Sequence, residues 1–297
     1  MSTISVSKDF SVFCDALSLS DEVKKKIELR KRSITKSINS EYWHSQSETD
    51  HCMIVGSHGR GTGIYTSDID MIVELPWSEY SKYNNYAWNG QSSLLQAVKQ
   101  CVQKTYARTD LSGDGQVVDA VFSDSIKFEI VPAFRFDDGS YYYPDTNNGG
   151  SWKSMDPQKE ILMFSYYDAL YGGNLRNLCR MARAWKEKMN VLMPGILIDT
   201  IACYFLNQYK YAKESFSYYD WMSRDFFSFV VENDSKTCWS KYWSDDTVEA
   251  KYAASNGQDA KKAYLLSLEA LDAGRHDYSY TWHSKWREIY GSRYPEL

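Results

Sequence analysis

The sequence contains no long apolar run, and no stretch approaches the ~18–20 apolar residues of a membrane-spanning helix. Its opening segment, MSTISVSKDFSVFCDALSLS, lacks the basic stretch and apolar run of a secretory signal peptide. The six cysteines are widely spread and form no C-x-x-C pair, which favours reduced core thiols over a disulfide framework. These absences predict a cytoplasmic protein that does not enter a membrane.

Positive charge is also scarce, because 34 Lys and Arg stand against 39 Asp and Glu and leave a net charge of −5. This balance argues against tight, sequence-independent binding of long nucleic acid, which needs a basic face. It allows small nucleotides, whose charge can be met by metal ions and one local basic patch. A hydrophobic fraction of 43% over 297 residues is enough for one large domain or two lobes with a sizeable core.

Hydrophobic spacing predicts an α+β lobe over residues 1–157 and a helical lobe over 158–297. A cleft between two such lobes is the expected place for a small-molecule site. We predict one long loop at 135–157 and no strand after it. The expected helices are 21–43, 91–107, 158–171, 175–190, 196–212, 217–233, 258–273 and 279–290, and the expected strands are 52–55, 68–75, 116–122 and 126–134.

Two carboxylates, Asp68 and Asp70, lie two residues apart at the start of a predicted strand. Alternate side chains of a strand point to the same face, so both carboxylates are expected on one side, a few ångströms apart. Such a pair repels itself strongly unless a cation neutralises it. Oxygen ligands of this kind favour hard divalent cations, Mg²⁺ above all.

A third carboxylate on a neighbouring strand would complete a two-metal site, in which two ions stabilise the attacking and leaving oxygens. Glu129 is the leading candidate, because it is a lone acid in the apolar run 126–134 and shares a face with Lys127 and Val131. An acid in such a run must be paired or bind a metal. Asp119, on the preceding strand, is the competing candidate.

Glycines mark the segment just before this strand. Gly56 and Ser57 form a turn that lets the backbone approach a phosphate closely, with the hydroxyl and amide groups as donors. The Gly-rich loop 58–67 that follows is expected to fold back under a triphosphate.

A basic stripe lies on one face of the predicted helix 175–190, and its members are Arg176, Arg180, Arg183 and Lys186. Such a stripe could bind a triphosphate, or it could be a solvated charged face.

The order of these motifs resembles the DNA polymerase β-type nucleotidyltransferase superfamily: apolar-Gly56-Ser57, a spacer, Asp68-Ile-Asp70, then an apolar-acid-apolar strand. Within it, Gly-Ser-His-Gly-Arg-Gly-Thr, Glu129-Ile-Val-Pro-Ala133 and the segment 143–152 are similar to the cGAS/DncV-like class of bacterial cyclic-oligonucleotide synthases. The third acid is Glu here, whereas many members of that class have Asp.

The resemblance implies a fold, a site and an activity. The fold is a polymerase β-like lobe, with a mixed twisted sheet and a long N-terminal helix, packed on a helical lobe. Asp68, Asp70 and Glu129 are the implied catalytic residues and ligands of two Mg²⁺ ions, with Mn²⁺ as an alternative. Gly56 and Ser57 hold the nucleotide phosphates. A basic residue on the helix contacts the phosphates, which favours Arg183 or Lys186.

The implied activity is template-independent synthesis of a cyclic di- or trinucleotide second messenger, with release of pyrophosphate, in antiphage (CBASS) signalling. The substrates would be ATP, GTP or a pyrimidine NTP, and the enzyme a monomer whose effector is a separate protein. Two alternatives stay open: an RNA-tailing or protein-nucleotidylating transferase of the same fold, and a catalytically silent nucleotide-sensing module.

Overall fold

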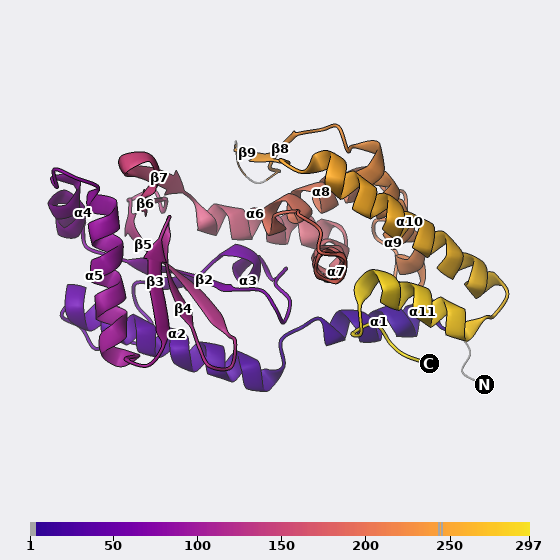
Figure 1. Ribbon diagram of the computed structural model, residues 1–297, viewed down its shortest axis with the longest axis horizontal. Coiled ribbons are helices and arrows are strands. Elements are labelled where there is room, and N and C mark those ends of the chain that lie inside the picture. The colour runs from indigo at the N-terminus through magenta and orange to yellow at the C-terminus, as the bar shows by residue number, and fades with distance from the viewer. Residues whose placement is uncertain (1–3, 243, 245) are drawn as a thin grey trace. The chain divides into compact units, whose positions relative to one another are not determined.

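The computed structural model describes residues 4–242, 244 and 246–297, and it divides into two compact units (Figure 1). The sheet unit comprises residues 20–60 and 66–161, and the helical unit comprises 4–19, 61–65 and 162–297. The predicted division has one boundary, after residue 157. In the structure the chain instead leaves and re-enters each unit, because an N-terminal helix and part of the Gly-rich segment pack with the C-terminal half.

A mixed sheet forms the centre of the sheet unit and has seven strands within the described residues. Five of them have the order β1-β2-β5-β4-β3, and the β6-β7 hairpin pairs with the C-terminal end of β5. Strands β2 and β5 pair in parallel, and the other strand pairs in the described residues of this sheet are antiparallel. The strands are β1 (Cys52–Ile54), β2 (Ile69–Glu74), β3 (Asp110–Asp114), β4 (Val117–Val121), β5 (Lys127–Arg135), β6 (Tyr141–Asp145) and β7 (Ser151–Met155).

Two long helices, α2 (Asp21–Tyr42) and α5 (Gly90–Thr105), pack on one face of this sheet. Their apolar stripes and the inward residues of β2, β4 and β5 form one buried cluster. Ser20 caps α2 by accepting a hydrogen bond from the Val23 amide at 3.3 Å. The strands alternate, so their polar residues lie on the opposite face, where the site is built. The short helices α3 (Gly56–Arg60) and α4 (Trp77–Asn84) complete the unit.

The helical unit has its own large apolar core. Its helices are α1 (Val6–Ala16), most of α6 (Pro157–Leu170), α7 (Asn174–Met189), α8 (Gly195–Gln208), the 3₁₀ turn η2 (Phe216–Tyr218), α9 (Tyr219–Glu232), α10 (Ala253–Arg275) and α11 (Ser279–Tyr290). A two-stranded sheet, β8 (Cys238–Ser240) with β9 (Thr247–Glu249), covers part of α8. None of the helices in the described ranges is both long and apolar enough to span a membrane.

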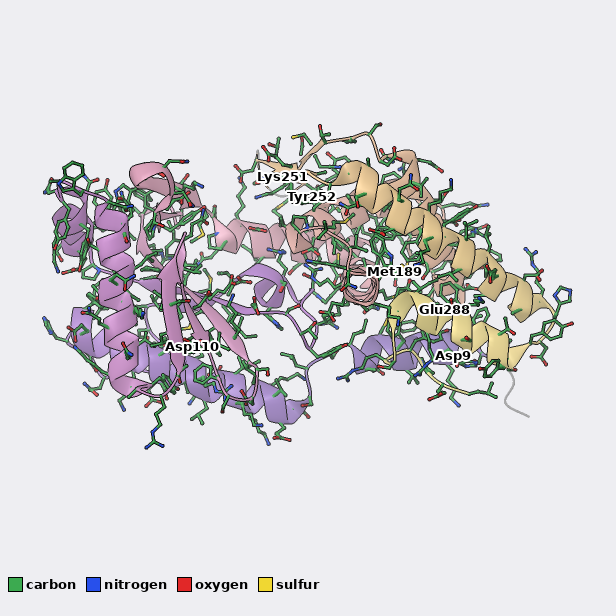
Figure 2. All side chains as sticks on the ribbon, viewed as in Figure 1. Asp9, Asp110, Met189, Lys251, Tyr252 and Glu288 are labelled. Carbon is green, nitrogen blue, oxygen red and sulfur yellow. The ribbon has the colours of Figure 1, made fainter. Side chains whose placement is uncertain are left out.

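Helix α1 belongs to the helical unit because its apolar face fits the aromatic residues of the C-terminal region. Phe10 and Phe13 are fully buried, and Phe10 meets the ring of Trp286 edge-on at 5.2 Å. Asp9, labelled on α1 in Figure 2, accepts a hydrogen bond from the indole N–H of Trp282 on α11 at 3.2 Å. The first and last helices of the chain are therefore packed together.

The predicted α+β class is confirmed, and so are the long helix after Ser20 and the hairpin of β4 and β5. Two predictions are wrong. Residues 135–157 are not one loop, because β6 and β7 form a hairpin closed by the 3₁₀ turn η1 (Asn147–Gly149). Strands also occur after residue 157, namely β8 and β9. Helices α1, α3 and α4 and strand β3 were not predicted, and α3 includes residues 58–60 of the segment predicted as a Gly-rich loop.

Candidate active site

Three carboxylates lie in one row across three neighbouring strands of the sheet unit. Asp70 on β2 pairs in register with Glu129 on β5, and Glu129 pairs in register with Asp119 on β4. Residues that are direct neighbours in a sheet point to the same face. Asp68, which immediately precedes β2, adds a fourth carboxylate at one end of this row and is 46% exposed. Both acids that the sequence offered as the third carboxylate are therefore present on one face.

A lysine occupies the middle of these carboxylates. Lys127 is two residues before Glu129 on the same face of β5, and its Nζ lies 2.6 Å from Glu129 Oε1. The same Nζ is 3.1 Å from Asp119 Oδ1 and 3.4 Å from Asp68 Oδ2. Partial burial acts to lower the pKa of Lys127, but the nearby carboxylates of Glu129 and Asp119 outweigh it and raise the pKa above its ordinary value. Lys127 is thus a fixed positive charge at neutral pH.

The carboxyl group of Asp70 has a raised pKa. Burial raises its pKa, and the neighbouring charge of Glu129 raises it further. The guanidinium of Arg60 acts in the opposite direction. Arg60 is itself only 6% exposed and pairs with Glu160 at 2.7 Å. Sequence reasoning missed Arg60, although its place four residues after Gly56 on α3 puts it beside the carboxylates.

The Gly56-Ser57 turn is built against Asp70. The Val55 amide donates to the Asp70 carbonyl at 2.9 Å, and the Gly59 amide donates to the Val55 carbonyl at 2.8 Å, so α3 starts where β1 meets β2. Gly56 has φ +59°, and a Cβ placed there would lie 1.9 Å from Asp70 Oδ2. Any side chain at 56 must therefore displace the Asp70 carboxylate.

We expect Gly56→Ala to remove most of the activity of this site by moving Asp70. Gly115→Ala is the matched control, because Gly115 has φ +62° and open space within 4 Å. Both substitutions carry the backbone cost of about 1–2 kcal/mol for a left-handed residue, but only the first creates the clash. Thermal unfolding and nucleotide turnover measured on both variants check this. Equal loss of turnover in the two would contradict the role given to Gly56.

The predicted basic stripe on α7 is largely engaged within the helical unit. Arg176 pairs with Asp168 at 2.8 Å, and Arg180 Nε donates to the Gly61 carbonyl at 3.0 Å. These two arginines therefore hold the start of α7 and the Gly-rich segment in place. Neither contact involves the carboxylates of β2 and β5.

Arg183 forms a buried ion pair with Asp199 on α8. The two N–O distances are 2.5 and 3.0 Å, and Asp199 is fully buried. Asp199 also accepts a hydrogen bond from the hydroxyl of Thr62 at 3.0 Å. This bidentate geometry gives Arg183 a structural role that the sequence did not predict.

Lys186 differs from its neighbours on the stripe, because no described residue forms an ion pair with it within 4 Å. It is half-buried, and burial together with the charge of Arg183 lowers its pKa. Arg183 and Lys186 were both predicted to contact phosphate. Arg183 pairs with Asp199, whereas Lys186 forms no ion pair with any described residue.

The donor set of the sheet unit suits a hard cation, because it consists of carboxylate oxygens around Asp70, whose pKa is raised by burial and by the neighbouring Glu129. In the described part of the chain, no three His, Cys, Asp or Glu side chains are already gathered as a metal site. Lys127 provides the positive charge there. The residue types fit Mg²⁺, and binding it requires the Lys127 ammonium to give way.

The fold is the polymerase β-like one that the solved structures described below share. A family model described as "Second Messenger Oligonucleotide or Dinucleotide Synthetase domain" (SMODS) matches residues 4–165, more than half of the chain. The chain belongs to this family. No curated protein sequence matches it.

Solved structures share the fold over nearly the whole chain at low sequence identity. The CdnC:HORMA-deltaN complex of E. coli MS115-1 aligns with a TM-score of 0.70 and 15% identity, covering 98% of each chain. Bradyrhizobium diazoefficiens CdnG, a CD-NTase in complex with GTP, gives 0.68 and 9%, covering 98% of this chain and 96% of that one. Vibrio cholerae DncV, a cyclic AMP-GMP synthase with the linear intermediate pppA(3′,5′)pG, gives 0.71 and 13%, covering 95% and 94%.

Proposed function

We propose that this chain is a template-independent nucleotidyltransferase that makes a cyclic di- or trinucleotide from NTPs and releases pyrophosphate. The observation that carries this proposal is the register of Asp70 with Glu129 on parallel strands, next to the Gly56-Ser57 turn, in a chain of the SMODS family. A role in antiphage signalling in the cytoplasm, as a monomer with a separate effector protein, belongs to the same proposal.

In this proposal Asp68, Asp70 and Glu129 hold two Mg²⁺ ions, or Mn²⁺, which offset the charge of the phosphates and lower the pKa of the attacking hydroxyl. Ser57 and the backbone of its turn donate to the β- and γ-phosphates. Lys186 adds a positive charge for the triphosphate. Glu129 accepts the proton of the ribose hydroxyl as its oxygen bonds to the α-phosphorus, and the bond to pyrophosphate breaks.

The test is a reaction with Mg²⁺ and all four radiolabelled NTPs, followed by phosphatase treatment and chromatography. We expect a phosphatase-resistant product, and omitting one NTP at a time identifies its bases. Labelled product only with added RNA or protein would favour an RNA-tailing or protein-nucleotidylating enzyme. NTP binding without turnover under every condition would favour a silent nucleotide sensor. Either of these outcomes would overturn the proposal.

A further inference from the structure

The proposed cation site already contains a positively charged side chain, that of Lys127, which would repel a metal ion. Its ammonium contacts three of the four carboxylates and lies closest to Glu129, a proposed metal ligand. A lysine and a divalent cation cannot both hold the same carboxylate oxygen without strong repulsion. Either Lys127 weakens metal binding, or its ammonium can pair with a carboxylate that is not a metal ligand.

Asp119 is such a carboxylate. It pairs in register with Glu129 from β4, on the side away from Asp70, because β5 lies between β2 and β4. Its Oδ1 is already 3.1 Å from Lys127 Nζ. Lys127 can therefore release Asp68 and Glu129 and keep one carboxylate partner, with little movement of its flexible side chain.

We propose that Lys127 and Asp119 form a cation-exchange pair: Lys127 neutralises Asp68 and Glu129 in the metal-free protein and stays on Asp119 alone when a divalent cation binds. The proposal rests on the proposed function, because it assumes that Asp68, Asp70 and Glu129 are metal ligands. Lys127 and Asp119 are positioning residues here, since they act on the ligands and do not touch substrate.

The experiment measures Mn²⁺ binding to the whole protein by electron paramagnetic resonance, without nucleotide or turnover. Four proteins are compared: wild type, Lys127→Met, Asp119→Asn and the double variant. Removing the competing ammonium is expected to tighten Mn²⁺ binding about tenfold or more. Asp119→Asn is expected to weaken it about tenfold, because Lys127 then has only Asp68 and Glu129 as partners.

The double variant is decisive. With Lys127 absent, Asp119→Asn should change Mn²⁺ affinity by less than about twofold, because Asp119 no longer has a lysine to hold. An equal weakening in both backgrounds would overturn the proposal, since Asp119 would then act through its own charge. Loss of binding in both backgrounds would make Asp119 a direct ligand and would overturn it as well.

The controls separate this proposal from the proposed function. Lys153→Met removes a lysine that pairs with Asp145 on the β6-β7 hairpin, and it should leave Mn²⁺ affinity unchanged. Circular dichroism checks that Lys127→Met is folded. If it is not, Lys127→Gln replaces it in the same test. If wild type and Lys127 variants all fail to bind Mn²⁺, the metal assignment fails and this proposal falls with it. Binding without coupling between Lys127 and Asp119 overturns this proposal alone.

Discussion

Replacing Asp68 or Asp70 by Asn is expected to lower nucleotide transfer by about a thousandfold or more, because each loss of 1.4 kcal/mol of charge stabilisation is tenfold in rate. The fold should survive both changes. Burial and the charge of Glu129 together raise the pKa of Asp70, so its ionised form carries an electrostatic penalty. A neutral amide of the same shape relieves that penalty, so Asp70→Asn should not lower the free energy of unfolding.

Product formation and urea unfolding should be measured on the same preparations. Asp138→Asn is a suitable control, because Asp138 is exposed and accepts hydrogen bonds from Ser140 within its own turn. It should leave the rate unchanged. Wild-type turnover in the Asp68→Asn/Asp70→Asn double variant would disprove the metal-ligand assignment, and simple unfolding of Asp70→Asn would disprove the electrostatic account of that residue.

Replacing Asp199 by Ala is expected to cost about 3–5 kcal/mol of stability, because it leaves the buried Arg183 charge without its partner. Thr62 loses its hydrogen bond to Asp199 at the same time. Urea unfolding followed by tryptophan fluorescence measures the loss, since Trp185 on α7 is fully buried in the core of the same unit. Combining Asp199→Leu with Arg183→Met should recover much of the stability, because no unpaired charge remains.

Lys186→Ala is the companion measurement. Its stability change should stay below about 1 kcal/mol, as for substitutions that break no buried network, while NTP affinity falls. A stable Asp199→Ala protein with weakened NTP binding would instead assign Arg183 to the substrate.

The Asp68-x-Asp70 pair could be predicted because strand alternation is a local property of the sequence. The choice between Glu129 and Asp119 could not be settled in the same way. It depends on the register of β2 with β5 and of β5 with β4, and register joins residues about sixty positions apart or across a turn. The structure shows that both acids share one face, with Glu129 between the other two. The sequence also placed Lys127 on that face, but not on three carboxylates at once.

The failures have equally specific causes. Tyr141 to Met155 was read as a loop because its Pro, Gly and Asn residues obscure a hairpin whose Tyr side chains pack on the sheet. The ion pair of Arg183 was not predicted, because a guanidinium on a helix gives no sign of whether it binds phosphate or carboxylate oxygens. Its true neighbour, Asp199, lies on the next helix. Helix α1 was missed because its partners are distant in the sequence: Phe10 meets the ring of Tyr219, and Asp9 bonds to Trp282.

That separation has a consequence for how the protein is made. Asp9 can reach Trp282 only after another 273 residues have been synthesised, and Phe10 waits about as long for Trp286. At about 5–20 residues per second, this part of the α1 face waits roughly 15–50 s for these two tryptophans. The sheet unit needs neither α1 nor α11 for its core, so it can fold during that interval. The helical unit therefore completes its core last, and its aromatic surface is the part of the nascent chain most exposed to aggregation and to chaperones.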